Sequence, residues 1–575
     1  MTRLRTALTA GLAAAALAVA APASAAPLID TPEPSIAAAA VTAGSGPVSV
    51  AVVVPLTVPP TETGVLDAAT LATYTAQGGI LDRELDAVAG TSAAVGIDPM
   101  ITASIQLLGA SAPDDALAFL ERLRSLPNEI FVLSYADADP ALAAVAGTTG
   151  ALAPLGFDSL LDPANFGPAV TPSATPSADP GATATPEPTT PPDDGAPPPL
   201  PTTEALVAWP ATLPAIAWPA EGTVTAAGLD GLADQGYADV LVSSDNVSAT
   251  SSALADLGEL DGLVLDTAVT SALRDAVYAS TDLDYSAAQV TLTAALEAAM
   301  ITSPGRTIVA GLDRRWPFGE LRLPEALSAI EVDPSAQLVS LSAVLAGPES
   351  AADLIEPAGD PLAARAETLA QLSAATQEES AYLVIADDPA VIVEPRRLAF
   401  LGLSSIGWRT DDPAWETATT TTLEAAQATL DAVQIVDGSD QLLLSGISNL
   451  RLQVSNALPV PVTVRLTVRP LRPLLPIESP SVELTIEPDS TSTASVPVEA
   501  IINGDVTVRA ELHSPTGSMI APARFFKVVV QAGWETVGTV VAGVLLVAIF
   551  GGGLARSILR RRREAAGDTG AGSDD

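Results

Sequence analysis

The two ends of the chain constrain it most, because each carries an apolar segment with a different length and different flanking charges. Arg3 and Arg5 precede an apolar stretch at 7–21 that is too short to span a bilayer, and small residues follow at 23–25. This pattern predicts a secretory signal peptide over 1–25. A second uncharged stretch, at 537–555, predicts a transmembrane helix, because its roughly 28 Å of helix approaches the ~30 Å hydrocarbon core.

The charges beside the second segment predict its orientation. Arg556 and the run Arg560 to Arg563 follow it directly. By the positive-inside rule these arginines keep the tail at 556–575 in the cytoplasm and leave the rest of the mature chain outside. The sequence therefore predicts a single-pass protein of the cell membrane with its N-terminal domains extracytoplasmic.

Composition excludes several classes of function. A formal net charge of −42 argues against nucleic acid as a partner, because nucleic-acid binders need clustered cations to displace counterions. The chain has no cysteine and a single histidine, His513, so disulfides, thiol nucleophiles, histidine triads and multi-histidine zinc sites cannot be built. We predict no metal and no cofactor.

Most of the mature chain alternates between strand-like and helix-like segments. The first strand is a valine-rich run, Val48 to Val54, and a helical pattern follows at 66–90. The pattern predicts further strands at 101–108, 130–135, 205–209, 238–243, 263–265, 307–312 and 337–341, and further helices at 113–126, 140–146, 226–235, 249–257, 287–300 and 324–330. About eight strands without hairpin signals favour an α/β fold with parallel strands, a (β/α) barrel-like domain, over an open doubly wound sheet.

Changes in composition divide the chain into domains. A segment rich in proline, threonine and serine at 171–203 cannot form a core and predicts a disordered insertion. It separates the two parts of the barrel-like domain, 47–170 and 204–432, the second of which includes flanking helices. From 433 to 530, short alternating segments separated by turn residues predict an all-β, immunoglobulin-like β-sandwich.

In a (β/α) barrel the carboxyl ends of the strands carry the chemistry, so the residues there are the candidate site. Paired carboxylates near aromatic rings are what a glycoside hydrolase needs. The catalytic candidates are Asp137, Asp139, Asp245, Asp266 and Asp313, and the ligand-binding candidates are Tyr135, Trp209, Arg314, Arg315 and Trp316. The alternative is structural, because aspartates after strands also cap helices and make turns, and the arginines can pair with them.

Several motifs resemble a known family. They are SYADADPA at 134–141, AWPAEGTVTAAGLDGLADQGY at 217–237, DRRW at 313–316, and NGDVTVRAELHSPTG and WETVGTVV near the membrane. With them the chain resembles an actinobacterial membrane-anchored family of unknown function, domain-of-unknown-function family 6049, often encoded beside the lipid II flippase. The barrel half is also distantly similar to polysaccharide deacetylase and glycosidase barrels, but it lacks the histidines of the deacetylase metal site.

Topology, domains and resemblance together lead to one expectation and two rivals. We expect a non-catalytic protein of the bacterial cell envelope that binds peptidoglycan, another envelope glycan or a membrane protein of cell-wall synthesis. The enzyme rival is a metal-independent glycoside hydrolase that uses two of the candidate aspartates. The third possibility is a structural scaffold for a membrane partner.

Overall fold

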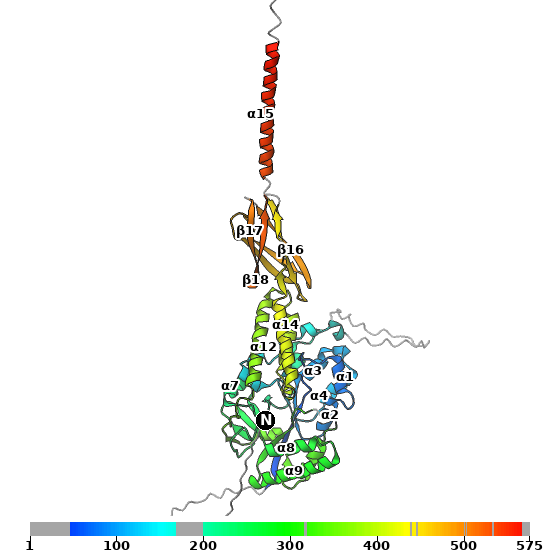
Figure 1. The fold of residues 1–575 in the computed structure, drawn as a ribbon. Helices are drawn as coiled ribbons and strands as arrows, with labels where there is room; N and C mark the ends of the chain where they lie inside the picture. Colours follow the sequence, from blue (N-terminus) through cyan, green and yellow to red (C-terminus); the bar gives the residue numbers. More distant parts are fainter. Residues whose placement is uncertain are drawn as a thin grey trace, which may run out of the picture. The chain divides into compact units, whose positions relative to one another are not determined.

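The computed structural model describes residues 46–167, 199–315, 319–437, 440–443, 447–499, 501, 503–531 and 534–565. The predicted signal peptide, most of the predicted insertion and Trp316 lie outside these ranges. The described part is a mixed α/β protein with a parallel half-barrel sheet, a separate β region and one C-terminal apolar helix (Figure 1).

The half-barrel sheet follows the order β10-β6-β7-β8-β1-β2-β3, with β4 and β5 joined to it through β7 and with β9 beside β1. Its pairs are parallel except β6 with β7. The strands are β1 (Val48–Leu56), β2 (Ala94–Ile97), β3 (Ile130–Val132), β4 (Ile216–Ala217), β5 (Asp239–Ser243), β6 (Leu254–Asp256), β7 (Asp261–Leu265), β8 (Thr307–Gly311), β9 (Ala336–Leu338) and β10 (Glu349–Ala351).

Strand β1 is central and is buried on both faces, as its continuous apolar sequence predicts. Val50 and Val52 contribute to one hydrophobic core, together with helix residues such as Leu273 and Leu327. Val53, on the other face, belongs to a second core made largely of residues from neighbouring strands. The alternation of side chains along one strand therefore supplies both cores.

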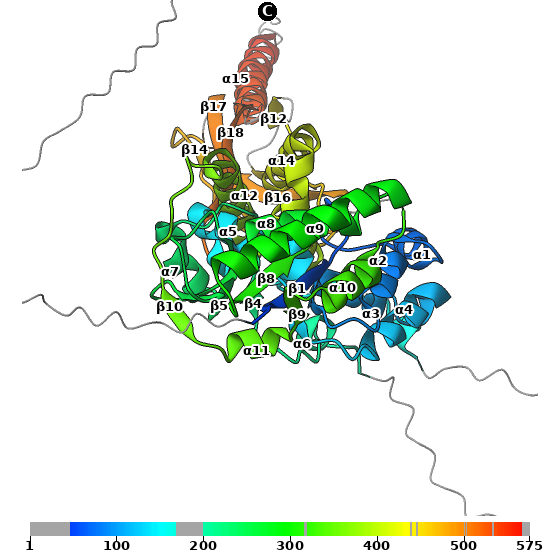
Figure 2. The ribbon, with the colours of Figure 1, turned by 90° about the horizontal axis from the view of Figure 1, so that it is seen from below.

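Helices cover the sheet, and α8, α9 and α10 lie along β1 and β8 (Figure 2). The helices before the β region are α1 (Ala68–Thr75), α2 (Ile80–Val88), α3 (Pro99–Leu107), α4 (Asp114–Arg124), α5 (Pro140–Ala146), α6 (Thr203–Val207), α7 (Ala226–Asp234), α8 (Thr267–Val277), α9 (Asp282–Thr302), α10 (Leu323–Val332), α11 (Leu341–Leu345), α12 (Ala363–Tyr382), α13 (Ala390–Leu403) and α14 (Asp412–Leu430).

Three of the sequence-based element predictions are wrong. The segment 101–108 belongs to helix α3, because Asp98 caps its N-terminus and Pro99 occupies its first turn, and the strand is β2 just before it. The segment 205–209 overlaps helix α6, which Thr202 caps. The predicted helix at 249–257 contains strand β6 instead.

The β region consists of two sheets, in the orders β11-β13-β16 and β12-β18-β17-β14-β15. Valines from both sheets, among them Val454, Val464, Val496 and Val508, share one hydrophobic core. The strands are β11 (Val433–Ile435), β12 (Gln441–Leu443), β13 (Ile447–Asn456), β14 (Val462–Pro470), β15 (Ser481–Ile486), β16 (Ser490–Glu499), β17 (Gly504–His513) and β18 (Met519–Val530).

The last element is helix α15 (Trp534–Ala565). Its segment Gly538–Arg563 contains an 18-residue stretch with a mean hydropathy of 2.1, and that stretch is not buried by other parts of the described chain. By length and composition this helix can cross a membrane, which confirms the prediction of one such helix at the C-terminal end.

Candidate functional site

Residues that follow different strands of the half-barrel meet at the carboxyl ends of those strands. Arg314, which follows β8, forms an ion pair with Asp137, which follows β3. The Nη2–Oδ1 distance is 2.9 Å and the Nε–Oδ2 distance is 3.2 Å, so the pair is bidentate. Arg314 also donates to the carbonyl oxygen of Trp218, just after β4, at 3.0 Å.

The Asp137–Arg314 pair is deeply buried. The side chain of Asp137 is 5% exposed and that of Arg314 is 10% exposed. The guanidinium lies 4.8 Å from the ring centroid of Trp218, and the ring of Phe131 stacks on Trp218 with a centroid distance of 6.1 Å. Burial raises the pKa of Asp137, and the charge and hydrogen bonds of Arg314 oppose that rise. Through its bonds to Asp137 and to the carbonyl of Trp218, Arg314 links the segments that follow β8, β3 and β4.

The backbone around Asp137 is strained. Ala136 and Asp137 have φ values of +59° and +49°, a region that residues with a side chain seldom adopt. The carboxylate of Asp98, which follows β2, accepts the N–H groups of Met100 at 2.9 Å and Ala136 at 2.8 Å. Asp98 thus caps helix α3 and holds the strained turn at the same time. Burial, with a further contribution from Asp137, raises the pKa of Asp98 to about 8.

A second polar cluster is more exposed. Arg274 of helix α8 donates to the carbonyl of Gly311 at 2.8 Å, pairs with Glu221 at 2.6 Å and lies 3.9 Å from Asp313. Asp313 accepts the Nε–H of Arg315 at 2.9 and 3.0 Å. The side chains of Glu221 and Arg315 are 51% and 52% exposed, so this cluster presents polar groups to solvent.

Tyr278 supports the exposed end of this cluster. The guanidinium of Arg315 lies 4.4 Å from the centroid of the Tyr278 ring. The hydroxyl of Tyr278 donates to the backbone carbonyl of Asp313 at 3.2 Å. A planar guanidinium that rests on an aromatic ring is held in one orientation while its N–H groups stay available to a ligand. We call Glu221, Arg274, Tyr278, Asp313 and Arg315 the polar rim.

Hydroxyl groups lie at the ends of the neighbouring strands β5 and β7. Thr267 Oγ1 lies 3.0 Å from Ser243 Oγ and 2.9 Å from Ser244 Oγ. Ser243 ends β5, Ser244 follows it, and Thr267 lies two residues after the end of β7. Because β5 and β7 pair with each other, the sheet itself brings these side chains together. They add small polar groups with adjustable hydrogens to the same edge of the sheet.

The remaining candidate aspartates do not join this network. Asp139 accepts the N–H groups of Ala141 and Leu142 and so caps α5, and Asp266 caps α8 through Val269. Asp245 is exposed just after β5. Of the five candidate aspartates, two therefore form ion pairs with arginines: Asp137 pairs with Arg314, and Asp313 pairs with Arg315 and Arg274.

The aromatic candidates have different positions. Tyr135 is 4% exposed, donates its hydroxyl hydrogen to Gly64 at 2.9 Å and packs on Phe157, so it belongs to the core. Trp209 follows helix α6 instead of ending a strand, and it packs against the same core. Trp316 lies outside the described residues.

Sequence reasoning missed Asp98, Glu221, Arg274 and Tyr278. Asp98 was hidden by the incorrect strand at 101–108, although Asp-Pro before an apolar run is a helix-start signal. Arg274 and Tyr278 lie at the end of a helix far along the chain from Glu221, and no local pattern marks their approach. No group of three or more histidine, cysteine, aspartate or glutamate side chains able to hold a metal occurs within the described ranges.

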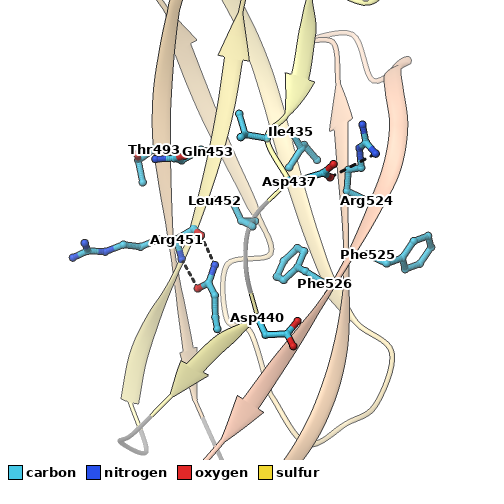
Figure 3. A pocket seen from close by; sticks show the side chains of 12 residues that line it. Ile435, Asp437, Asp440, Arg451, Leu452, Gln453, Thr493, Arg524, Phe525 and Phe526 are labelled. Carbon is cyan, nitrogen blue, oxygen red and sulfur yellow. Dashed lines mark hydrogen bonds and ion pairs between the residues drawn. The ribbon is translucent and has the colours of Figure 1, made fainter.

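The β region contains a pocket of its own, of about 320 Å³, between its two sheets (Figure 3). Asp437 and Arg524 face each other there at 3.6 Å, and Gln441 bonds to the backbone N–H and C=O of Arg451. Phe526 lies beside them, while Phe525 points away and is 60% exposed. None of the site residues predicted from the sequence lines this pocket, so it is a polar surface of the β region separate from the polar rim.

Comparison with known proteins gives a family match. A family model described as "Family of unknown function (DUF6049)" matches residues 35–569, which is most of the chain. No curated protein matches.

Three solved structures each match a small part of the chain. Native α2-macroglobulin from Escherichia coli, spanning domain MG7 to the C-terminus, matches at 22% identity and a TM-score of 0.15 over 17% of this chain and 16% of that one. WR4, a Caenorhabditis elegans MSP family member, matches at 5% identity and a TM-score of 0.14 over 17% of this chain and 97% of that one. The PapD-like domain 7 of human CEP192 matches at 14% identity and a TM-score of 0.14 over 18% of this chain and 84% of that one. Matches of this extent carry no argument about function.

Proposed function

This chain belongs to DUF6049, a family of unknown function, and we propose that it is a membrane-anchored protein of the bacterial cell envelope that binds an envelope glycan without cleaving it. In this proposal helix α15 is the anchor, and the N-terminal domains lie outside the cytoplasm. The polar rim at the carboxyl ends of the half-barrel strands is the binding surface.

The observation that carries the proposal is the arrangement of Asp313 and Arg315. Both follow β8, both are partly exposed, and Tyr278 orients the guanidinium of Arg315. Fixed carboxylate and guanidinium groups can hydrogen-bond neighbouring hydroxyls of a sugar, and the hydroxyls of Ser244 and Thr267 extend the same edge.

Binding is favoured over hydrolysis by what the carboxylates already do. A glycoside hydrolase needs two carboxyl groups free to exchange a proton and to attack or activate water. Asp137 is neutralised by Arg314, Asp313 is paired with Arg315, and the two capping aspartates hold helix termini. Asp245 is the only exposed one of the five candidates, so any pair of them includes at least one carboxylate that is engaged in the fold.

The finer description of the fold belongs to the same proposal. We take the half-barrel as a (β/α) barrel that is incompletely closed. Among the described residues β3 and β4 do not pair with each other, but Thr212 and Leu213, just before β4, donate backbone N–H groups to Ile130 of β3 and bridge the gap. We take the two sheets of the β region as an immunoglobulin-like sandwich. Its valine-rich shared core is the arrangement that such a sandwich requires.

Orientation can be tested because the chain has no cysteine. Thr420→Cys places a thiol on the exposed surface of α14, and Ser573→Cys places one in the predicted cytoplasmic tail. A membrane-impermeant maleimide added to intact cells should label the first variant and spare the second. The opposite pattern would contradict the proposed orientation.

Glycan binding is tested by sedimentation of the detergent-solubilised full chain with insoluble peptidoglycan. The proposal predicts saturable co-sedimentation that Arg315→Ala weakens at least tenfold. Arg124→Ala, which removes an exposed arginine from helix α4, is the matched control and should bind like the parent chain. No binding by the parent chain would favour a protein partner of cell-wall synthesis instead.

A further inference from the structure

Helix α15 does not stop where its apolar sequence ends. It continues without a break to Ala565, through a stretch that contains five arginines between 556 and 563. The arginines are therefore carried on the same helix as the membrane-spanning segment, at fixed angles to it. In a chain whose formal net charge is −42, five cations within eight residues form a distinct positive patch.

The spacing of these arginines places three of them on one face. Arg556, Arg560 and Arg563 are separated by four and three residues, so they form a stripe along the helix about 10 Å long. Arg561 and Arg562 lie about 140° and about 120° around the helix from Arg556, on its other side, and are not part of this stripe. We call Arg556, Arg560 and Arg563 the arginine stripe. Leu554 and Ile558, which are 67% and 50% exposed, lie on the side opposite the stripe, one to two turns before Arg561 and Arg562.

The positions along the helix match the depth of lipid headgroups. The uncharged part, 538–555, covers roughly 27 Å, so Arg556 lies close to the boundary of a ~30 Å hydrocarbon core. Arg560 follows about 6 Å further along the axis, at the level of the phosphates. The long side chain of Arg556 can extend toward the same level while its methylene groups stay in the apolar layer.

We propose that the arginine stripe binds the phosphodiester headgroups of anionic phospholipids in the adjoining leaflet. A guanidinium presents a planar fork of N–H donors that matches phosphate oxygens. Leu554 and Ile558, which lie nearer the apolar segment than Arg560 and Arg563, suit contact with acyl chains. This interaction is separate from glycan binding and does not depend on it.

The test uses the full chain in lipid nanodiscs and again exploits the absence of cysteine. Ser557→Cys allows a donor fluorophore to be attached beside the stripe. Energy transfer is then measured to acceptor-labelled phosphatidylglycerol or phosphatidylcholine, present at the same mole fraction. We expect phosphatidylglycerol to be enriched around the label by roughly fivefold or more, the factor expected when even one arginine engages an anionic headgroup.

Two double variants of equal charge separate a specific stripe from a general electrostatic effect. Arg556→Gln with Arg560→Gln should reduce the enrichment several-fold, whereas Arg561→Gln with Arg562→Gln should retain most of it. Equal transfer to the two lipids in the parent chain would overturn the proposal. Equal loss in the two double variants would also overturn it, since the positive charge would then act without a preferred face.

Discussion

The guanidinium of Arg314 and the carboxylate of Asp137 form a bidentate ion pair although 177 residues separate them in the chain. The pair joins the segment after β8 to the strained turn after β3, and Trp218 after β4 supports it from the side. It is therefore a structural connection between strand ends, and in the sequence Arg314 lies between two residues of the exposed polar rim, Asp313 and Arg315.

Removal of Arg314 should destabilise the half-barrel. Arg314→Ala leaves the carboxylate of Asp137 buried without its partner, and the expected loss in free energy of unfolding is about 3 kcal/mol. Arg315→Ala, which breaks a more exposed pair, should cost about 0.5 kcal/mol. Chemical denaturation of the detergent-solubilised chain, followed by tryptophan fluorescence, measures both. A similar loss for the two variants would contradict the structural role of Arg314.

Asp98 should make stability depend on pH. Its pKa is about 8 in the folded protein against 3.8 ordinarily, so between these values the folded state holds a proton that the unfolded state has lost. Stability should therefore fall as pH rises from about 4 to about 8. Asp98→Asn retains a good helix cap and should flatten this fall.

The control for this pH dependence is Asp67, whose pKa is lowered by the N–H and hydroxyl groups of Thr70. Its contribution to stability is present above the unfolded pKa and is lost as pH falls below it, so Asp67→Asn should affect only the acidic range. If Asp98→Asn leaves the slope between pH 4 and pH 8 unchanged, the assignment of that slope to Asp98 is wrong.

Gly64 should tolerate no side chain. Its φ is +67°, and an added Cβ would lie 1.9 Å from the carbonyl oxygen of Leu398. Gly64→Ala is expected to lower the free energy of unfolding by about 3 kcal/mol. The backbone at Leu398 would have to move away from the new Cβ, and alanine would be strained at this positive φ. Gly78, with φ of +75° and open space around it, is the matched control, and Gly78→Ala should cost about 1 kcal/mol. Thermal or chemical unfolding of the two variants provides the comparison.

Tyr135 separates a core role from a ligand-binding role. Tyr135→Phe removes the hydrogen bond to the Gly64 carbonyl, and it should cost about 1 kcal/mol of stability. Peptidoglycan binding should not change, because the ring is buried against Phe157. A binding defect without a loss of stability would restore Tyr135 as a ligand-contacting residue.

The sequence was most informative where composition alone decides the structure. A valine run such as Val48 to Val54 has few alternatives to a strand buried on both faces, and α15 is marked by its length and hydropathy. The apolar run at 101–108 was ambiguous, because a helix buried on nearly all sides shows no clear periodicity. The Asp98–Pro99 signal would have resolved it.

The candidate site was only partly predictable, because its geometry depends on distant contacts. Asp137, Asp313, Arg314 and Arg315 were found from their positions after strands, but no local pattern predicts that Arg314 reaches Asp137 while Arg315 turns to Tyr278. Arg274 lies within a helix, so a search restricted to strand ends could not include it. The pairing of chain segments by the sheet determines these contacts.

The most direct test of the proposed function is titration of soluble peptidoglycan fragments into the full chain in detergent, with binding measured calorimetrically. The account predicts saturable binding that Arg315→Ala and Glu221→Gln each weaken while Arg124→Ala does not. Because Arg315 is exposed, loss of binding by Arg315→Ala with near-normal stability would place the glycan at the polar rim. Saturable binding that is unchanged in both rim variants, or no binding by the parent chain, would contradict the account.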